Sequence, residues 1–231
     1  MNWATFTDSV KGFVNRTGTD LTQGSTDMIL TAANMAKTFA QRKRVFHMAR
    51  DTAFLAASDL GTAISDAKDA PGSGSAVAIR KIEQAYMYGV NGTSNVRARR
   101  VRFISLQDVR LYYPIATANE LNPQLISLDP AEIAAYIKGT KMYSLGLSSA
   151  SGLYFWLDVV KWMPDYTGSN TDFFLDYHSD WLIAKTCDFL NIYLKEDQRV
   201  AISQAKLDEA WRSVCAFDEE FARSDNLDEA E

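Results

Sequence analysis

The sequence predicts an α+β fold in which N- and C-terminal helices form a helical bundle with a central β-rich insertion of hairpins. Apolar residues recur at helical spacing in residues 1–56 and again in residues 171–223. Between residues 57 and 170, glycine, serine and proline are frequent and the apolar runs are short. We therefore expect bundle helices in 1–56, the insertion in 57–170, a helical hairpin in 171–223 and a separate tail in 224–231.

The composition is that of a folded chain with a sizeable core. Of its 231 residues, 47% are hydrophobic and 12% are aromatic. Cys187 and Cys215 fall on apolar sides of expected helices, which is typical of reduced, buried thiols. No run of about 18 apolar residues is present, and the first residues lack the apolar core of a signal peptide. We expect a cytosolic, unprocessed chain without a membrane partner.

The negative charge is concentrated near the C-terminus. The formal net charge is −5. From Asp218 to Glu231 the chain has seven acidic residues and one basic residue, a net of −6, so the remainder is close to neutral at +1. Residues 224–231 are too charged to form a core and are expected to be disordered in isolation. Two interpretations remain open, a solvated end or a segment that orders on a partner.

Two helices are expected near the N-terminus. The first covers about residues 7–15, and the second begins at Ser25 or Thr26, either of which can cap it. Asp27 then lies near the positive end of the helix dipole. The apolar spacing extends this helix to Phe46, with Arg50 towards its far end.

The middle of the chain is expected to form hairpins and one short helix. Residues 90–93 contain the Asn91-Gly92 pair of a type I′ turn. A second hairpin is expected between residues 141–145 and 152–162, and a short helix over residues 131–137 after Pro130. The strand over residues 153–160 is apolar on both faces and needs cover from helices or another subunit, so the candidate subunit-packing residues are Phe155, Trp156 and Trp162.

The C-terminal quarter predicts two consecutive amphipathic helices, residues 177–194 and 196–221. Asp197 is a candidate N-cap for the second helix. An antiparallel helical hairpin is the expected arrangement, and its apolar faces indicate packing and assembly.

Catalytic and cofactor motifs are not found in the sequence. His47 and His178 lack cysteine or carboxylate neighbours at metal-ligand spacing. A phosphate-binding loop, a dinucleotide fingerprint and a serine nucleophile elbow are also missing. We therefore expect no enzyme activity, no cofactor and no metal. An enzyme built from dispersed carboxylates remains an alternative hypothesis.

Four arginines, Arg97, Arg99, Arg100 and Arg102, make the strongest local charge feature. In a strand, alternation places the first two on one face and the last two on the other. Three interpretations are open: ion pairs at a subunit interface, a solvated edge strand, or contact with a DNA phosphate backbone.

The order of these features resembles the head-to-tail adaptor (connector) proteins of short-tailed bacteriophages. The resemblance rests on residues 6–18, on residues 32–36 of the expected long helix, on residues 102–108 with Tyr112-Tyr113-Pro114, and on the closing helices. These are patterns of residue type across most of the chain. The middle section differs in length from that of the smaller adaptors, which leaves the tail-docking surface undefined.

The resemblance implies a structural virion protein of the neck, made in the host cytoplasm. It implies a homo-oligomeric ring of twelve copies that binds below the portal protein, extends the channel for double-stranded DNA and docks tail or nozzle proteins. The arginine cluster is then a candidate for subunit or DNA-channel contacts. The candidate portal contacts are Ser224, Asp225, Asn226, Leu227, Asp228 and Glu229. The alternative function is a nucleic-acid-binding module that uses the cluster Arg97–Arg102.

Overall fold

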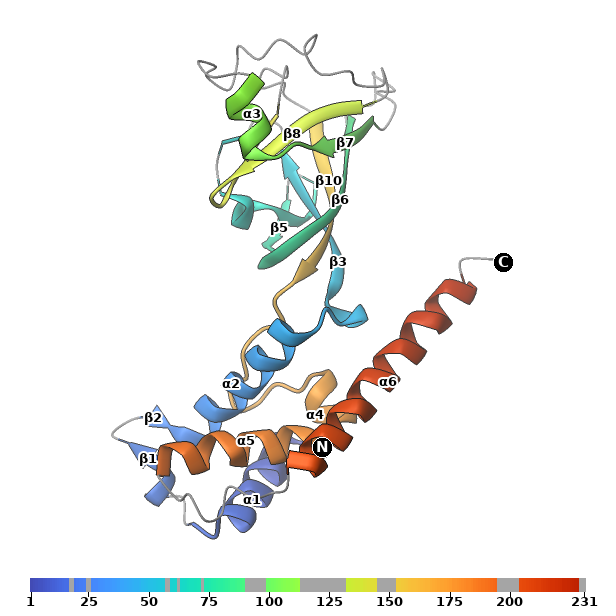
Figure 1. Cartoon of the computed structure of the whole chain (residues 1–231). Coiled ribbons are helices and arrows are strands. Elements are labelled where there is room, and N and C mark those ends of the chain that lie inside the picture. The colour runs from blue at the N-terminus through green and yellow to red at the C-terminus, as the bar shows by residue number, and fades with distance from the viewer. Residues whose placement is uncertain are drawn as a thin grey trace. The chain divides into compact units, whose positions relative to one another are not determined.

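The structure is a computed structural model that describes residues 1–16, 19–23, 26–56, 59–61, 63–71, 73–89, 99–112, 132–144, 153–194 and 204–228. The chain forms two compact units (Figure 1). Unit 1 combines Met1–Met48 with Met163–Glu231, and unit 2 is Ala49–Trp162. The sequence had predicted a β-rich insertion over residues 57–170, whereas unit 2 covers residues 49–162.

The fold is α+β, but the predicted architecture is wrong. The dominant element is an eight-stranded, curled mixed sheet, and not a set of hairpins inserted into a terminal helical bundle. The error has a physical cause. Several of the pairings in this sheet join distant segments, such as β3 with β10, and local sequence patterns carry no record of such partners.

Unit 1 is mainly helical. Its helices are α1 (Trp3–Val14), α2 (Met28–Lys43), α4 (Phe173–Tyr177), α5 (Ser179–Leu194) and α6 (Gln204–Asp228). Shorter elements are η1 (Thr19–Leu21), β1 (Thr22–Gln23), β2 (Thr26–Asp27) and η2 (His47–Ala49), of which the last crosses into unit 2. The fully buried side chains at its centre include Phe6, Phe46, Phe174, Trp181 and Leu182.

Asp27 begins α2, which corrects the prediction of a Ser25 or Thr26 cap. Its Oδ1 accepts hydrogen bonds from the backbone N–H of Ile29 (2.9 Å) and Leu30 (3.1 Å), which would otherwise lack helical partners. The helix ends at Lys43, earlier than predicted, and Arg50 begins a strand.

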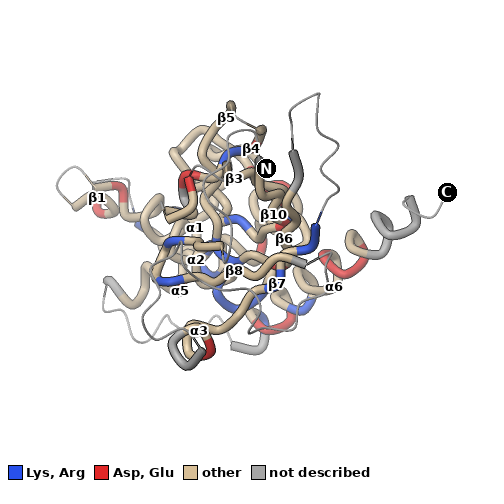
Figure 2. Tube along the Cα trace, turned by 90° about the horizontal axis from the view of Figure 1, so that it is seen from above, with Lys and Arg blue, Asp and Glu red and all other residues tan. Residues whose placement is uncertain are grey.

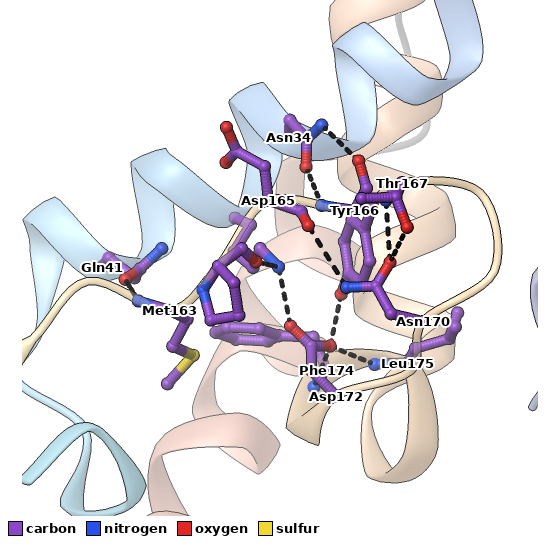
Figure 3. A network of polar contacts seen from close by, with 12 residues as sticks. Asn34, Gln41, Met163, Asp165, Tyr166, Thr167, Asn170, Asp172, Phe174 and Leu175 are labelled. Atoms are coloured by element: carbon purple, nitrogen blue, oxygen red, sulfur yellow. Dashed lines mark hydrogen bonds and ion pairs between the residues drawn. The ribbon is translucent and has the colours of Figure 1, made fainter. Parts of the chain in front are cut away.

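A buried lysine on α2 holds the segment that re-enters unit 1 from the sheet. Figure 3 shows the polar network of this segment, which includes Asn34, Tyr166 and Asp172. Lys37 is fully buried; its Nζ donates to Asp172 Oδ2 at 2.9 Å and to the carbonyl of Pro164, and lies 3.7 Å from the ring centroid of Tyr166. Asp172 also caps α4 by accepting from the backbone N–H of Phe174 at 3.1 Å. One carboxylate thus neutralises a buried charge and starts a helix.

Two amides on the same side of α2 extend this network. The Asn34 side chain accepts from Tyr166 N at 2.7 Å and donates to Tyr166 O at 3.2 Å, as a neighbouring strand would do. Gln41 Oε1 accepts from Met163 N at 2.7 Å. Side chains of α2 therefore satisfy several backbone polar groups of this irregular segment, and Asn170 of the segment itself accepts from Thr167 N and donates to Asp165 O.

Asp218 connects α6 to the end of α2. Its buried carboxylate accepts from the backbone N–H of His47 at 2.7 Å and from Arg44 Nε at 3.1 Å. The join between α5 and α6, including the expected Asp197 cap, lies outside the described residues. Because α6 continues to Asp228, residues 224–228 are helical, which differs from the expected disordered tail.

Unit 2 contains the sheet, whose strand order is β5-β4-β3-β10-β6-β7-β8-β9. The strands are β3 (Arg50–Ala56), β4 (Lys68–Ala70), β5 (Ser73–Ala76), β6 (Ile79–Gly89), β7 (Arg99–Phe103), β8 (Glu132–Lys138), β9 (Lys141–Ser144) and β10 (Leu153–Lys161), with a one-turn helix η4 at Ile64–Asp66. The inner face is apolar and includes Leu55, Ala85, Met87, Phe155 and Leu157.

The sheet curls until its β9 edge meets the segment that follows β3 (Figure 1). Gly61 N donates to Met142 O at 2.8 Å, and Ile64 N donates to Thr140 O at 2.7 Å. These bonds satisfy backbone groups on the edge of β9 that faces away from β8, so this edge strand is partly covered. On the outer side of β8, helix α3 (Leu106–Tyr112) packs Val109 against Ala134 and Tyr136.

Two predicted elements of the middle section are wrong. Residues 132–138 form strand β8, parallel to β7, where a helix was expected. β9 pairs with β8, whereas β10 lies between β3 and β6, so the expected hairpin of residues 141–145 with 152–162 does not form. The Asn91-Gly92 turn lies outside the described residues.

Replacing Lys37 with methionine should destabilise unit 1 by about 3 kcal/mol, because Asp172 would keep its buried charge without the lysine. Urea denaturation followed by circular dichroism at 222 nm measures this loss. Lys11→Met is the matched control. Lys11 forms an exposed i,i+3 pair with Asp8, so its loss should cost less than about 0.5 kcal/mol. Equal costs for the two variants would contradict a special role for Lys37.

Candidate functional site

Three of the four arginines, Arg99, Arg100 and Arg102, lie on β7, which lies between β6 and β8 in the sheet (Figure 2 shows Lys and Arg in blue). Arg99 shares the side of the inward-facing Val101, whereas Arg100 and Arg102 point to the outer face, as strand alternation predicted. All three are exposed. Arg97 lies outside the described residues. The structure therefore joins Arg100 and Arg102 into a basic pair and separates Arg99 from them.

A hollow of about 320 Å³ lies beside this pair, between β6 and β7. Among the described residues, the pairing of these strands covers Tyr86 with Arg100 and Met87 with Arg99. Beyond it the hollow is lined by Glu83, Gln84, Ala85, Arg100, Val101, Arg102 and Phe103. The basic pair thus borders an open, mainly polar recess in the sheet.

The acidic residue of this hollow is already paired. Glu83 Oε2 lies 3.2 Å from Arg50 Nε, and its Oε1 lies 3.5 Å from Lys81 Nζ. Glu83 is the extra residue of a bulge on β6, where Asp158 pairs with Gln84 and Val159 with Ile82. Among the side chains that the structure describes, no ion pair joins Arg100 or Arg102; Glu132 of β8 lies opposite Arg100 in the parallel register. The two arginines make the hollow suited to an anionic ligand.

Three aromatic side chains continue from Arg100 across the outer face. The register aligns Arg100 with Tyr86, Tyr86 with Trp156, Trp156 with Phe54, and Phe54 with Lys68. We call Phe54, Trp156 and Tyr86 the aromatic row. The Phe54 and Trp156 rings lie 5.9 Å apart, and Trp156 is 44% exposed. The row has a basic residue at each end.

The three predicted subunit-packing residues have different environments. Phe155 is fully buried in the inner face of the sheet by its own chain. Trp156 belongs to the aromatic row, and Trp162 is 37% exposed beneath Arg80, whose guanidinium lies 5.3 Å from its ring. Only the two tryptophans of this set offer surface to a partner.

Sequence reasoning missed Phe54 and Tyr86. In residues 84–87, the more exposed Gln84 and Tyr86 alternate with the buried Ala85 and Met87. This alternation is typical of a strand and could have been recognised in the sequence. Phe54 was hidden because the region before residue 57 was assigned to helices. Their alignment with Trp156 depends on long-range pairing.

A second exposed surface lies on unit 1. Met35 and Phe39 of α2 and Phe189 and Ile192 of α5 form what we call the α2–α5 apolar strip, since the two helices pack together and the Phe39 and Phe189 rings meet at 6.5 Å. Ile192 is 62% exposed and Phe39 is 41% exposed. Lys185 Nζ lies 4.8 Å from both rings. The strip thus places large, partly exposed apolar side chains beside one another on two packed helices.

The predicted portal contacts lie at the end of α6. Residues 224–228 belong to the last turns of this helix, and Glu229 lies outside the described residues. The sequence had predicted no helix in residues 224–228.

The histidines and cysteines do not form a shared site. Within the described parts of the chain, no group of three or more His, Cys, Asp or Glu side chains is arranged to hold a metal ion. Cys187 and Cys215 are free thiols, and burial raises the pKa of Cys187 to about 12, which keeps it protonated. No helix in the described residues is long and apolar enough to cross a membrane.

His178 is buried between aromatic rings. It lies 4.8 Å from the Phe173 ring and 5.1 Å from the Phe217 ring, and its Nε2 has no hydrogen-bond partner among described atoms. Burial lowers the pKa of His178, and the negative charges of Asp180 and Asp218 offset this only in part. The neutral imidazole is therefore the form that the fold accommodates.

The comparisons with known proteins give no family. No protein-family model matches the sequence, and no curated protein matches it.

His178 should make unit 1 less stable as the pH falls. The unfolded chain binds a proton at a pKa near 6.5, whereas the folded chain resists it, so stability decreases below about pH 6.5, by at most about 1.4 kcal/mol per pH unit for one proton. His178→Phe should lose less stability than the wild type between pH 7 and pH 5, measured by urea denaturation at each pH. Parallel pH profiles for the two proteins would contradict this assignment.

Proposed function

We propose that the chain is a structural virion protein, a subunit of a head-to-tail adaptor ring that binds below the portal, extends the DNA channel and docks tail or nozzle proteins. The proposal combines the sequence resemblance with one structural observation, the exposed α2–α5 apolar strip. An exposed face of this kind is costly for an isolated chain and is ordinary at a permanent interface.

A closed ring needs two different patches on each subunit, because its contacts are head-to-tail. The α2–α5 apolar strip is one such patch. Phe13 of α1, 69% exposed, and Tyr177 of α4, 58% exposed, supply apolar surface outside the strip. Unit 1 therefore exposes apolar side chains both in the strip and outside it, as the two sides of a heterologous contact require.

The ring is tested by native mass spectrometry and electron microscopy of the purified chain, alone and mixed with a portal ring. The wild type should form a ring in at least one condition. The double variant Phe39→Ser with Ile192→Ser should remain monomeric while keeping its circular dichroism spectrum, because it places hydroxyls in the strip without disturbing buried residues.

Met48→Ser is the matched control for this variant. Met48 is 38% exposed and lies in η2, outside the strip. It should assemble like the wild type. A wild-type chain that stays monomeric in both conditions, or an equal loss in Met48→Ser, would contradict the proposal.

The end of α6 is the proposed portal contact. Deleting residues 224–231 should leave the melting temperature nearly unchanged, because these residues follow the buried anchor Asp218, and should weaken binding to a portal ring. Differential scanning fluorimetry and surface plasmon resonance measure the two effects. Portal affinity equal to that of the full chain would remove this contact from the proposal.

Nucleic-acid binding through the arginine cluster is the second candidate function. The observation that favours it is the hollow beside Arg100 and Arg102, two exposed arginines that form no ion pair with any side chain that the structure describes. Phosphate groups fit guanidinium geometry well. The two candidates use different units of the chain and can hold together.

A further inference from the structure

The outer face of the sheet combines aromatic rings with exposed basic side chains. Tyr86, Trp156 and Phe54 lie on three adjacent strands in one cross-strand line, and strands are spaced by about 4.8 Å. Arg100 continues this line on β7, and Lys68 ends it on β4. A ligand lying along the line would meet three rings between two cations.

The polar groups beside the line are also suited to a base and phosphate ligand. Arg102 lies on the same face as Arg100, and both line the hollow together with Gln84. Tyr86 OH donates to Gln84 Oε1 at 2.6 Å, which leaves the Gln84 amide N–H groups to a ligand. Of the nearby carboxylates, Glu83 is paired with Arg50 and Lys81, Asp158 is half-buried one row away, and Glu132 lies opposite Arg100 on β8.

We propose that the aromatic row and the basic pair form a binding platform for single-stranded nucleic acid. Bases stack on Trp156, Tyr86 and Phe54, and the phosphates meet Arg100 and Arg102 at the hollow. This inference rests on the second candidate function and goes further by naming the form of the ligand.

Stacking decides between single strands and duplex. In a duplex the base faces are covered by neighbouring base pairs, so only the arginines would contact it, through phosphates. Unpaired bases can lie flat on exposed aromatic rings, and such stacking is tolerant of sequence. Because the aromatic row would make no stacking contact with a duplex, it favours a single-stranded ligand.

The test measures binding of the full chain to a fluorescein-labelled dT20 strand and to a labelled 20-base-pair duplex by fluorescence anisotropy at low salt. We expect dT20 to bind more tightly than the duplex. Trp156→Ala should weaken dT20 binding about tenfold or more, and Trp156→Phe should restore most of it because a ring is retained.

Two further variants separate stacking from charge. Trp162→Ala is the matched control, since Trp162 has similar exposure but lies outside the aromatic row, and it should bind dT20 like the wild type. The double variant Arg100→Ala with Arg102→Ala should reduce the slope of log affinity against log salt by about 1.4, because each lost phosphate contact accounts for about 0.7.

Each result decides a different statement. If dT20 and duplex bind equally and Trp156→Ala has no effect, stacking is overturned while charge-based binding stands. If neither ligand binds at 50 mM salt, the second candidate function fails together with this inference. If Trp156→Ala changes the oligomeric state and not dT20 binding, a second copy covers this face and the inference is overturned.

Discussion

The buried pair of Lys37 and Asp172 is the contact on which unit 1 depends. It joins residues 135 positions apart, across the whole of unit 2. A lysine with no exposed surface is costly unless a carboxylate and further acceptors surround its ammonium group, and Asp172 with the Pro164 carbonyl provide this. Because Asp172 also starts α4, the helices that follow are positioned from this point.

Unit 2, with its large sheet, is inserted between the two chain segments that form unit 1. The chain enters unit 2 on β3 and leaves it on β10, and these two strands pair side by side over seven residues. At the ends of this pair, Asp51 forms a salt bridge with Lys161. The two crossings between units are therefore adjacent, as at a typical domain insertion, and the returning segment is then fixed by Lys37, Asn34 and Gln41.

The two units present different surfaces. Unit 2 contains 12 Lys and Arg against 10 Asp and Glu, whereas unit 1 contains 12 against 19. The exposed side chains of the α2–α5 strip are apolar, which suits a permanent protein contact. The exposed face of the sheet mixes aromatic rings with arginines, which suits a polyanion. The proposed division of roles between the units, assembly by one and ligand contact by the other, is consistent with this difference.

The sequence by itself determined the properties that depend on near neighbours along the chain. Helical periodicity located the amphipathic segments at both ends, and alternation in β7 separated Arg99 from Arg100 and Arg102. Tertiary structure alone decided the rest. Residues 132–138 became a strand because β7 offered a parallel partner, Phe54 and Tyr86 joined Trp156 through strand pairing, and Lys37 became a core residue through Asp172. Local patterns record the period of a segment, whereas the partner of each strand and buried charge is set by segments far away in the chain, which is why these features could not be predicted from the sequence.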